Sequence, residues 1–471
     1  MSRHPWVILS IVIAGLAAWM GLGTLHTSAH ADSLLPVLIS TQRWTPFFWG
    51  QDRFGMLVPL LAMPVHHPLG NLLLQGWIMT TAALLAPFVV SRFLTGRSDD
   101  WLAIGAGTNL LFLLITPPAV QYDWLVAQPY GISMLLAFAG LIGGDRSTRA
   151  GDALLAFFLL TLACWINIGI IVMIGIAAAV RVARPVRLLA LEAAGAAVAA
   201  LLAKYAASAH TVSALAPPAK WINGWTQLFQ NSFGAIANPQ IAIAAAVGAA
   251  IAIVWMIRRG RPSGRPGRYE PAIGGPLPWR TLMTAVAMAV GTWLVSGTSL
   301  WIGMNSYVFR YMYPTLMMAG VSAAILLWAP VAGQVKALST TVLMVMIAVA
   351  LVHSGRPSLG RLERDLDTRF GAQTPAILKS GATVIAGDYW RVWPAVFHAN
   401  LTLAHAHSRV QVFGLTARSE ATDALWRVPG QRVLIAAAAG DASAGPIADG
   451  HGVTVTLLEH RETIDLYTGQ P

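Results

Sequence analysis

The sequence predicts an α-helical protein with many membrane spans and a small α/β domain at its C-terminal end. Hydrophobic residues make up 56% of the 471 residues and charged residues only 11%, against about 25% charged in an average soluble domain. Apolar runs long enough to cross a bilayer recur up to residue 353. Beyond that residue the charges balance, with 11 basic and 11 acidic side chains. We therefore predict a membrane domain over 1–353 and a separate domain over 354–471.

The formal net charge of +11 belongs to the membrane part. Before residue 353 there are 20 basic and 9 acidic residues, and basic residues commonly flank membrane spans on the cytoplasmic side. The excess therefore indicates membrane lipids as a partner and no nucleic acid. The single cysteine, Cys164, lies within an apolar run, which excludes a disulfide framework and a thiolate metal site.

Ten apolar runs predict about eleven membrane spans. The run 153–182 is too long for one span of about 20 residues and short for two, and we predict two short helices with a break near Trp165–Asn167. This threading places 15 basic residues on the side of the N-terminus and five on the other side before residue 353. A single crossing would instead move the arginine-rich loop 258–268 outside, against the positive-inside tendency. The runs lie near residues 6–25, 71–94, 101–118, 130–144, 153–182, 188–207, 240–257, 280–302, 314–330 and 338–353.

The same threading predicts a multi-pass protein of the bacterial cytoplasmic membrane, with its N-terminus in the cytoplasm and its C-terminal domain outside. The first run also resembles a secretory signal, because Arg3 precedes it and the small residues Ala29-His30-Ala31 follow it. At about 20 residues it is longer than the usual signal core of 7–15 residues, which favours an uncleaved span. In both cases the segment after residue 26 faces the outer side.

The segment 26–70 is too polar to cross the bilayer, and we assign it to the membrane domain as a long outer loop. An aliphatic stretch in it predicts a short helix lying in the membrane interface, and aromatic side chains of the kind that favours headgroup depth follow. Met56–Pro64 is apolar but too short to span, so we expect it to dip into the boundary. The aliphatic residues are Leu34, Leu35, Val37, Leu38 and Ile39, and the aromatic ones are Trp44, Phe47, Phe48, Trp49 and Phe54.

The tail 354–471 has the size and pattern of one small α/β domain. Helical stretches at 359–370 and 393–405 accompany four candidate strands, and there is no phosphate-binding glycine motif. After the first strand, Trp390 and Trp393 lie where α/β folds bind ligands; sugar stacking and packing against the membrane domain both remain open for them. The strands are predicted at Thr383–Gly387, Val410–Leu415, Val433–Ala437 and Val453–Glu459.

Three carboxylates are expected on the outer side of the membrane part, where a reaction that needs a base has few other candidates. Asp32 follows the first span directly, and we interpret it as a catalytic base or as a helix N-cap worth about 1 kcal/mol. Asp52 stands beside Arg53, either as part of a substrate-binding pair or as a local ion pair. Asp123, in the next outer loop, is a substrate-binding residue or a turn residue.

One arginine, Arg310, lies in an otherwise apolar stretch at the outer end of two late spans, followed by Tyr311. A charge there is costly unless it is hydrated or paired. It either reaches out to the headgroups or forms a phosphate site, since a guanidinium gives bidentate hydrogen bonds to phosphate. The adjacent His66 and His67 are candidate donors to the same substrate. Without a spaced carboxylate they do not predict a metal site.

In layout this pattern resembles the GT-C superfamily of integral membrane glycosyltransferases. The likeness lies in the first span, the long outer loop with an early aspartate, the acidic second outer loop, the late Arg310-Tyr311 stretch and the extracytoplasmic C-terminal domain. The resemblance implies a polyprenyl-phosphate-linked sugar donor, Asp32 as base and Asp123 at the second-loop acidic position. The paired acidic motifs of oligosaccharyltransferase-type members are absent, so the resemblance implies no metal cofactor.

The sequence therefore predicts a glycosyltransferase acting on the extracytoplasmic side, with an envelope glycan, lipid or protein as acceptor and inversion at the sugar. Displacing a polyprenyl phosphate needs a base at the acceptor hydroxyl and cations on the phosphate, and a lipid donor places the site at the membrane surface. A transporter or lipid flippase is the main alternative, although transporters carry ionisable residues at midplane and often show repeats. A scaffold of envelope assembly, a ligase and an acyltransferase also remain open.

Overall fold

The computed structural model of the 471-residue chain divides by its contacts into two compact units. Unit 1 comprises Met1–Met20, Met79–Leu202 and Thr211–Gly355, and unit 2 comprises Gly21–Ile78, Ala203–His210 and Arg356–Pro471. The residues that the structure describes are 4–96, 100–146, 150–181, 185–207, 215–236, 238–244, 246–248, 254, 279–328, 335–416, 433–441 and 443–470.

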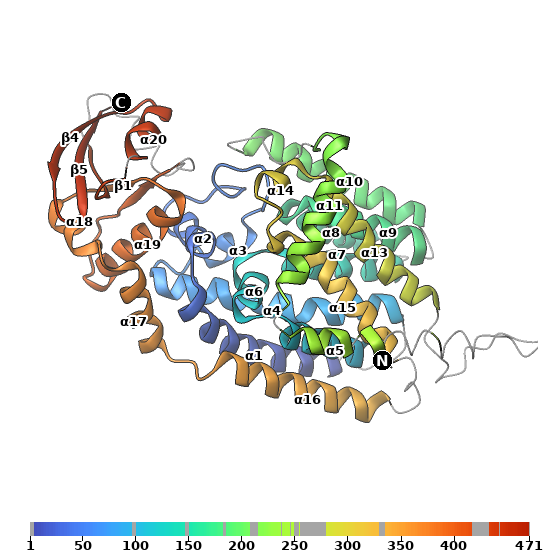
Figure 1. Ribbon diagram of the computed structural model, residues 1–471. Coiled ribbons are helices and arrows are strands. Elements are labelled where there is room, and N and C mark those ends of the chain that lie inside the picture. The colour runs from blue at the N-terminus through green and yellow to red at the C-terminus, as the bar shows by residue number, and fades with distance from the viewer. Residues whose placement is uncertain are drawn as a thin grey trace, which may run out of the picture. The chain divides into compact units, whose positions relative to one another are not determined.

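Unit 1 is built from helices (Figure 1). The prediction of a break near Trp165–Asn167 is confirmed, because α8 ends at Ile166 and the Asn167 side chain accepts the Gly169 N–H at the start of a new helical segment. The helices that lie wholly or mostly in this unit are α1 (His4–Ser28), α4 (Pro68–Thr95), α5 (Trp101–Ile115), α6 (Pro118–Tyr122), α7 (Tyr130–Arg146), α8 (Ala150–Ile166), α9 (Ile171–Arg181), α10 (Pro185–Ala206), α11 (Trp221–Gly234), α13 (Trp279–Thr298), α14 (Leu300–Met304), α15 (Tyr313–Trp328) and α16 (Val335–Ser354), with the short helices η1 (Asp123–Ala127), η2 (Ile168–Ile170), η3 (Pro218–Lys220) and η4 (Phe309–Met312).

Several of these helices are long and apolar enough to cross a membrane. Among the described residues, six helices have the length and composition of a membrane span. The helix pair Pro118–Ala127 and Tyr130–Gly144, bent by 55°, forms a seventh span if it crosses as one. The chain is thus a multi-pass membrane protein. Helices such as α5, α8 and α9 are apolar but shorter, so a total of about eleven spans stays a prediction. The arginine-rich loop 258–268 lies outside the described residues.

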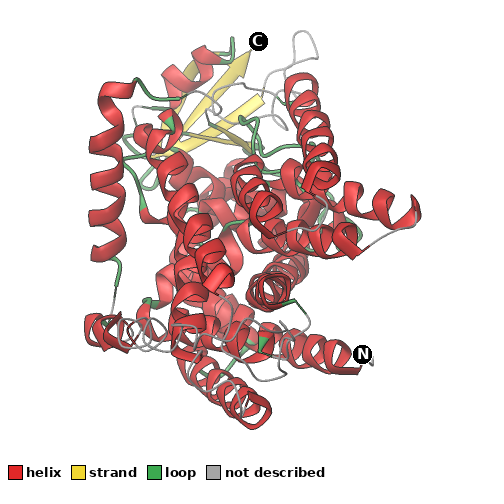
Figure 2. Ribbon diagram, turned by 90° about the vertical axis from the view of Figure 1, so that its right-hand side faces the viewer, coloured by secondary structure: helices red, strands yellow, loops and turns green. Residues whose placement is uncertain are grey.

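Unit 2 contains a mixed sheet of five strands, which are drawn in yellow in Figure 2. The strand order is β2-β1-β3-β5-β4; β1 pairs in parallel with β2 and β3, and β5 runs antiparallel to β3 and β4. The four predicted strands are present, and the last strand and two short helices were not predicted. The elements are α2 (Ala31–Thr41), α3 (Leu57–Ala62), α17 (Leu359–Phe370), α18 (Thr374–Ser380), β1 (Val384–Ala386), α19 (Tyr389–His405), β2 (Phe413–Leu415), β3 (Val433–Ala438), α20 (Ala444–Gly450), β4 (Thr454–His460) and β5 (Ile464–Gln470).

The outer loop 26–70 differs from the expectation of an interfacial helix. A helix does form at α2, but the five aliphatic side chains expected to line a face toward the interface are all fully buried within the protein. They are buried because α2 packs against α19 and α3 inside unit 2. The following aromatic residues Phe47, Phe48, Trp49 and Phe54 are also buried. The loop therefore contributes to the core of unit 2, through the contacts of α2 with α19 and α3.

Candidate functional site

Asp32 is the second residue of α2, and it does not cap the helix. The N-cap is His30, whose Nδ1 accepts the Asp32 backbone N–H at 3.3 Å, while the Ser33 hydroxyl accepts the His30 N–H at 3.2 Å. The interpretation of Asp32 as the N-cap is thus wrong, because a neighbouring side chain already satisfies the first turn. The half-buried Asp32 carboxylate makes a contact with a distant part of the chain.

That contact comes from the C-terminal region of the chain. The Tyr389 hydroxyl donates a hydrogen bond of 2.7 Å to Asp32 Oδ1 across 357 residues of sequence. Tyr389 is the first residue of α19, the helix that directly follows strand β1. The Asp388 carboxylate caps this helix by accepting the Trp390 N–H at 2.9 Å. The sequence signal was the aromatic stretch after a strand, but nothing in it paired Tyr389 with Asp32.

The loop between β1 and α19 is held in a defined conformation. Gly387 has a φ of 139° and donates its N–H to the Leu415 carbonyl of β2 at 3.1 Å. Asp441, after β3, lies against Gly387 and accepts hydrogen bonds from Ser443. Burial raises the pKa of Asp441, but the bonds from Ser443, the Asp388 N–H and the charge of Arg391 outweigh it, so that the pKa lies below the ordinary value. Two neighbouring loops at the carboxyl edge of the parallel strands are thereby tied together.

The two tryptophans after β1 have different environments. Trp390 is 47% exposed, and its ring lies edge-on to His30 at a centroid distance of 5.9 Å and to Tyr389 at 5.1 Å. Trp393 is fully buried and packs against Trp49 with ring centroids 5.6 Å apart. Trp393 is therefore a core residue, and the expectation of sugar stacking applies to Trp390 alone.

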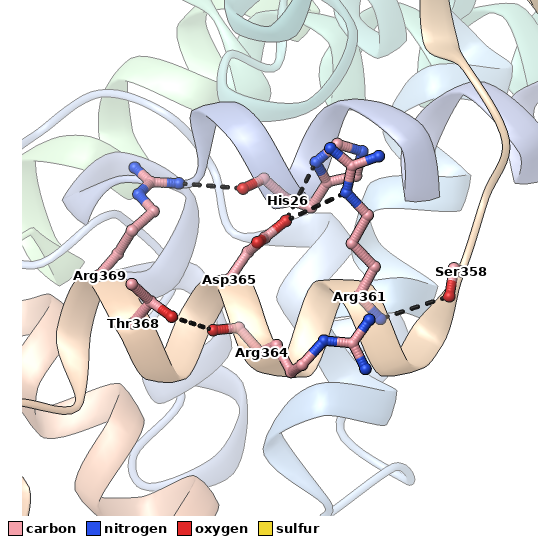
Figure 3. Close-up of polar contacts among 7 residues, drawn as sticks. All are labelled: His26, Ser358, Arg361, Arg364, Asp365, Thr368 and Arg369. Atoms are coloured by element: carbon pink, nitrogen blue, oxygen red, sulfur yellow. Dashed lines mark hydrogen bonds and ion pairs between the residues drawn. The ribbon is translucent and has the colours of Figure 1, made fainter.

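Helix α17 holds the turn that leads into Asp32 (Figure 3). The Arg369 guanidinium donates to the backbone carbonyls of His26 and Ala29, at 3.4 and 2.6 Å. The Asp365 carboxylate lies 3.4 Å from the His26 ring and 3.7 Å from the Arg361 guanidinium. Side chains of α17 thus hold the end of α1 and the turn as far as Ala29, three residues before Asp32.

The other predicted site residues of unit 2 lie near polar or aromatic partners. The Arg53 guanidinium donates from Nε to Gln51 Oε1 at 2.8 Å and lies over the Phe54 ring at 4.2 Å. Asp52 Oδ1 is buried and has no hydrogen-bond partner within the described part of the chain. These contacts show a packed turn at Asp52-Arg53, and its role as a substrate-binding pair stays a prediction.

The two predicted histidine donors are both exposed. The His67 ring stacks on His405 of α19 at a centroid distance of 5.3 Å. Although the side chain is exposed, desolvation by neighbouring groups and the charge of His405 lower the pKa of His67, against an opposing effect of Glu363. A neutral ring at this position can accept as well as donate a hydrogen bond. No group of three or more metal-ligating side chains occurs among the residues that the structure describes.

The other predicted site residues, Asp123, Arg310 and Tyr311, lie in unit 1. Asp123 begins the π-helix η1, and both it and Arg310 of η4 lie within electrostatic reach of Tyr313. The Tyr313 hydroxyl donates to the Val120 carbonyl at 2.8 Å. Tyr311 is 4% exposed and its hydroxyl accepts the Trp301 indole N–H at 3.2 Å. Tyr311 is thus largely buried in the protein.

The segment that leads into Arg310 has an unusual backbone. Ser306 and Tyr307 have positive φ values of 56° and 51°, a conformation that costs non-glycine residues energy and persists only where surroundings enforce it. Here the Asn231 side chain of α11 donates to the Tyr307 carbonyl at 2.8 Å, and Tyr307 packs with Leu228 in a buried cluster. The turn before Arg310 is therefore built by contacts with α11.

The chain has a structural likeness among known proteins. No protein-family model and no curated protein matches the chain. Among solved structures, it is similar to ArnT from Cupriavidus metallidurans bound to undecaprenyl phosphate, with 12% sequence identity, a TM-score of 0.46 and coverage of 99% of this chain and 98% of that one. The function proposed below rests on this chain's own residues.

Proposed function

We propose that the protein is a membrane glycosyltransferase that moves a sugar from a polyprenyl-phosphate donor to an acceptor hydroxyl on the extracytoplasmic side of the bacterial inner membrane. The proposal includes about eleven spans, a cytoplasmic N-terminus and an extracytoplasmic sheet domain. The resemblance of the sequence to GT-C enzymes supports the donor class. The acceptor is an envelope glycan, lipid or protein.

The observation that carries the proposal is the state of Asp32. It lies in the first turn of α2, where a helix favours negative charge, and its capping role is taken by His30. Its half-buried carboxylate accepts a hydrogen bond from Tyr389, which orients it within unit 2 for the role of a general base. A carboxylate that acts as a general base must be held in a fixed orientation, and the hydrogen bond from Tyr389 supplies that orientation.

In the proposed step, Asp32 takes the proton of the acceptor hydroxyl as its oxygen bonds to the anomeric carbon of the sugar. The bond between that carbon and the phosphate oxygen breaks, and polyprenyl phosphate leaves with the electron pair. Attack opposite to the leaving group inverts the configuration. A base of this kind contributes about 10²–10⁴ in rate.

Arg310 is the proposed cation for the donor phosphate, and its charge acts on the neighbouring Tyr313. A guanidinium matches two phosphate oxygens, whereas a lysine ammonium acts as a point charge. Arg310→Lys is therefore expected to raise the KM for the donor more than it lowers kcat. Equal donor kinetics for the Arg310→Lys and wild-type proteins would remove Arg310 from the phosphate site.

The test uses the purified full-length protein in lipid nanodiscs, a panel of polyprenyl-phosphate sugars and an envelope lipid extract as acceptor. Release of polyprenyl phosphate is followed for wild type, Asp32→Asn and the control Asp152→Asn, which changes an exposed first-turn carboxylate of α8. Release is expected in wild type and control, with a loss of about 10²–10⁴ in Asp32→Asn. Undiminished release by Asp32→Asn would overturn the assignment of the base. Absence of release from every donor would favour a transporter.

A further inference from the structure

The first turn of α19 presents an exposed aromatic face close to the helix that carries Asp32. The Trp390 indole is 47% exposed, although the next tryptophan on the helix, Trp393, is fully buried. The Trp390 ring lies 5.9 Å, between ring centroids, from the ring of His30, which is two residues before Asp32. The adjacent Tyr389 hydroxyl is bonded to the Asp32 carboxylate at 2.7 Å. An aromatic face, a hydroxyl and a carboxylate are thus gathered within unit 2.

This combination matches the surface of a sugar ring. A pyranose has a face of C–H groups, against which an aromatic ring can pack. The hydroxyls around its rim can donate hydrogen bonds to a carboxylate. Binding sites for small molecules generally combine aromatic walls with a few placed polar groups, and tryptophan offers the largest aromatic area. A protein or a simple lipid hydroxyl as acceptor would not need a stacking face at this position.

The geometry points to an acceptor subsite at the start of α19, in which Trp390 stacks on the sugar ring of a carbohydrate acceptor and Tyr389 positions Asp32 toward the hydroxyl of that ring. The inference rests on the proposed function and narrows its acceptor to a glycan or the sugar headgroup of a glycolipid. Tyr389 is a positioning residue that keeps its proton throughout the reaction.

The subsite is held in place before any ligand arrives. The Asp388 cap fixes the first turn of α19, and Asp441 binds the same loop from the end of β3. Gly387 adopts a backbone conformation that is rare for residues with a side chain. Preorganisation of this kind lowers the entropy cost of binding and orients the reacting groups. The sheet domain is therefore part of the acceptor site and not a separate module.

Steady-state kinetics separate the two roles. Trp390→Ala is expected to raise the KM for the acceptor about tenfold or more with a small change in kcat, because the aromatic face that covers the bound sugar ring is lost. Trp390→Phe, which keeps an aromatic face, should recover most of this loss. Tyr389→Phe is expected to lower kcat about tenfold to a hundredfold through misorientation of the base, with acceptor KM changed less than twofold. Tyr467→Phe on β5 is the matched control with unchanged kinetics.

A binding experiment tests the subsite without the transfer reaction. Saturation-transfer NMR is recorded for the wild-type protein without donor, in nanodiscs free of sugar detergents, with methyl glucoside, methyl galactoside and methyl mannoside as probes and glycerol as a non-ring control. Transfer to ring protons of at least one glycoside is expected, to be lost with Trp390→Ala and kept with Trp390→Phe. Equal transfer with and without Trp390 overturns the subsite.

The two assays also distinguish the subsite from the proposed function. Sugar release by wild type with unaltered acceptor KM in Trp390→Ala would overturn the subsite and leave the glycosyltransferase intact. Trp390-dependent glycoside binding without release from any donor would overturn the glycosyltransferase and retain a carbohydrate site. An unchanged kcat in Tyr389→Phe would remove the positioning role.

Discussion

The contact between α17 and the end of α1 gives a prediction whose size follows from the structure. Arg369 donates two hydrogen bonds to the carbonyls of His26 and Ala29. A hydrogen bond to a charged group contributes about 1.5–3 kcal/mol when sheltered, but the exposure of the Arg369 side chain and the longer of the two distances reduce the sum to about 1–2 kcal/mol. Arg369→Ala should therefore favour opening of the turn before Asp32 by about 5- to 30-fold.

Hydrogen exchange followed by mass spectrometry measures this opening. The amides of residues 26–33 are expected to exchange about 5- to 30-fold faster in Arg369→Ala than in wild type. The kcat of this variant is expected to be lower than that of wild type. Arg364→Ala is the matched control, because Arg364 lies on the same helix, is exposed, and contributes its backbone carbonyl to Thr368. Identical exchange of this peptide in Arg369→Ala and Arg364→Ala would refute the proposed restraint.

Two further predictions concern the sheet domain. Gly387→Ala should lower the free energy of unfolding by about 1–3 kcal/mol, because φ is 139° and an added Cβ would meet Asp441 Oδ2 at 2.5 Å, whereas Gly445→Ala has open space on α20 and should be neutral or slightly stabilising; equal melting temperatures for the two variants would contradict this reasoning. Hydrogen bonds from His460 and from the Gly440 N–H hold the pKa of the buried Asp465 below its ordinary value. Its stabilisation is present above about pH 4 and is lost as pH falls through the lower folded pKa. Asp465→Asn should therefore cost about 1 kcal/mol at pH 7, and a stability difference from wild type that persists unchanged at pH 3 would exclude this linkage.

Much of the fold could be predicted because it depends on local pattern. The four candidate strands of the sequence overlap β1, β2, β3 and β4, and the helical stretch 359–370 matches α17 residue for residue. The strand β5 was missed, although it pairs with both β3 and β4, because its place between these two strands depends on the way the sheet assembles. The aliphatic stretch of α2 showed that a buried or lipid-facing surface was needed, but the same residues satisfy either environment.

The candidate site shows the same division. The sequence by itself determined a multi-pass membrane protein with a small α/β domain, and it selected Asp32, Trp390 and Arg310 as residues whose chemistry needs an explanation. Only the tertiary structure decided that His30 caps α2, that Trp393 is core while Trp390 is exposed, and that Tyr389 holds the Asp32 carboxylate. Composition and periodicity show which residues gain free energy from burial, because that gain depends on each side chain by itself. A hydrogen bond across 357 residues depends instead on where two distant segments meet once the core has packed.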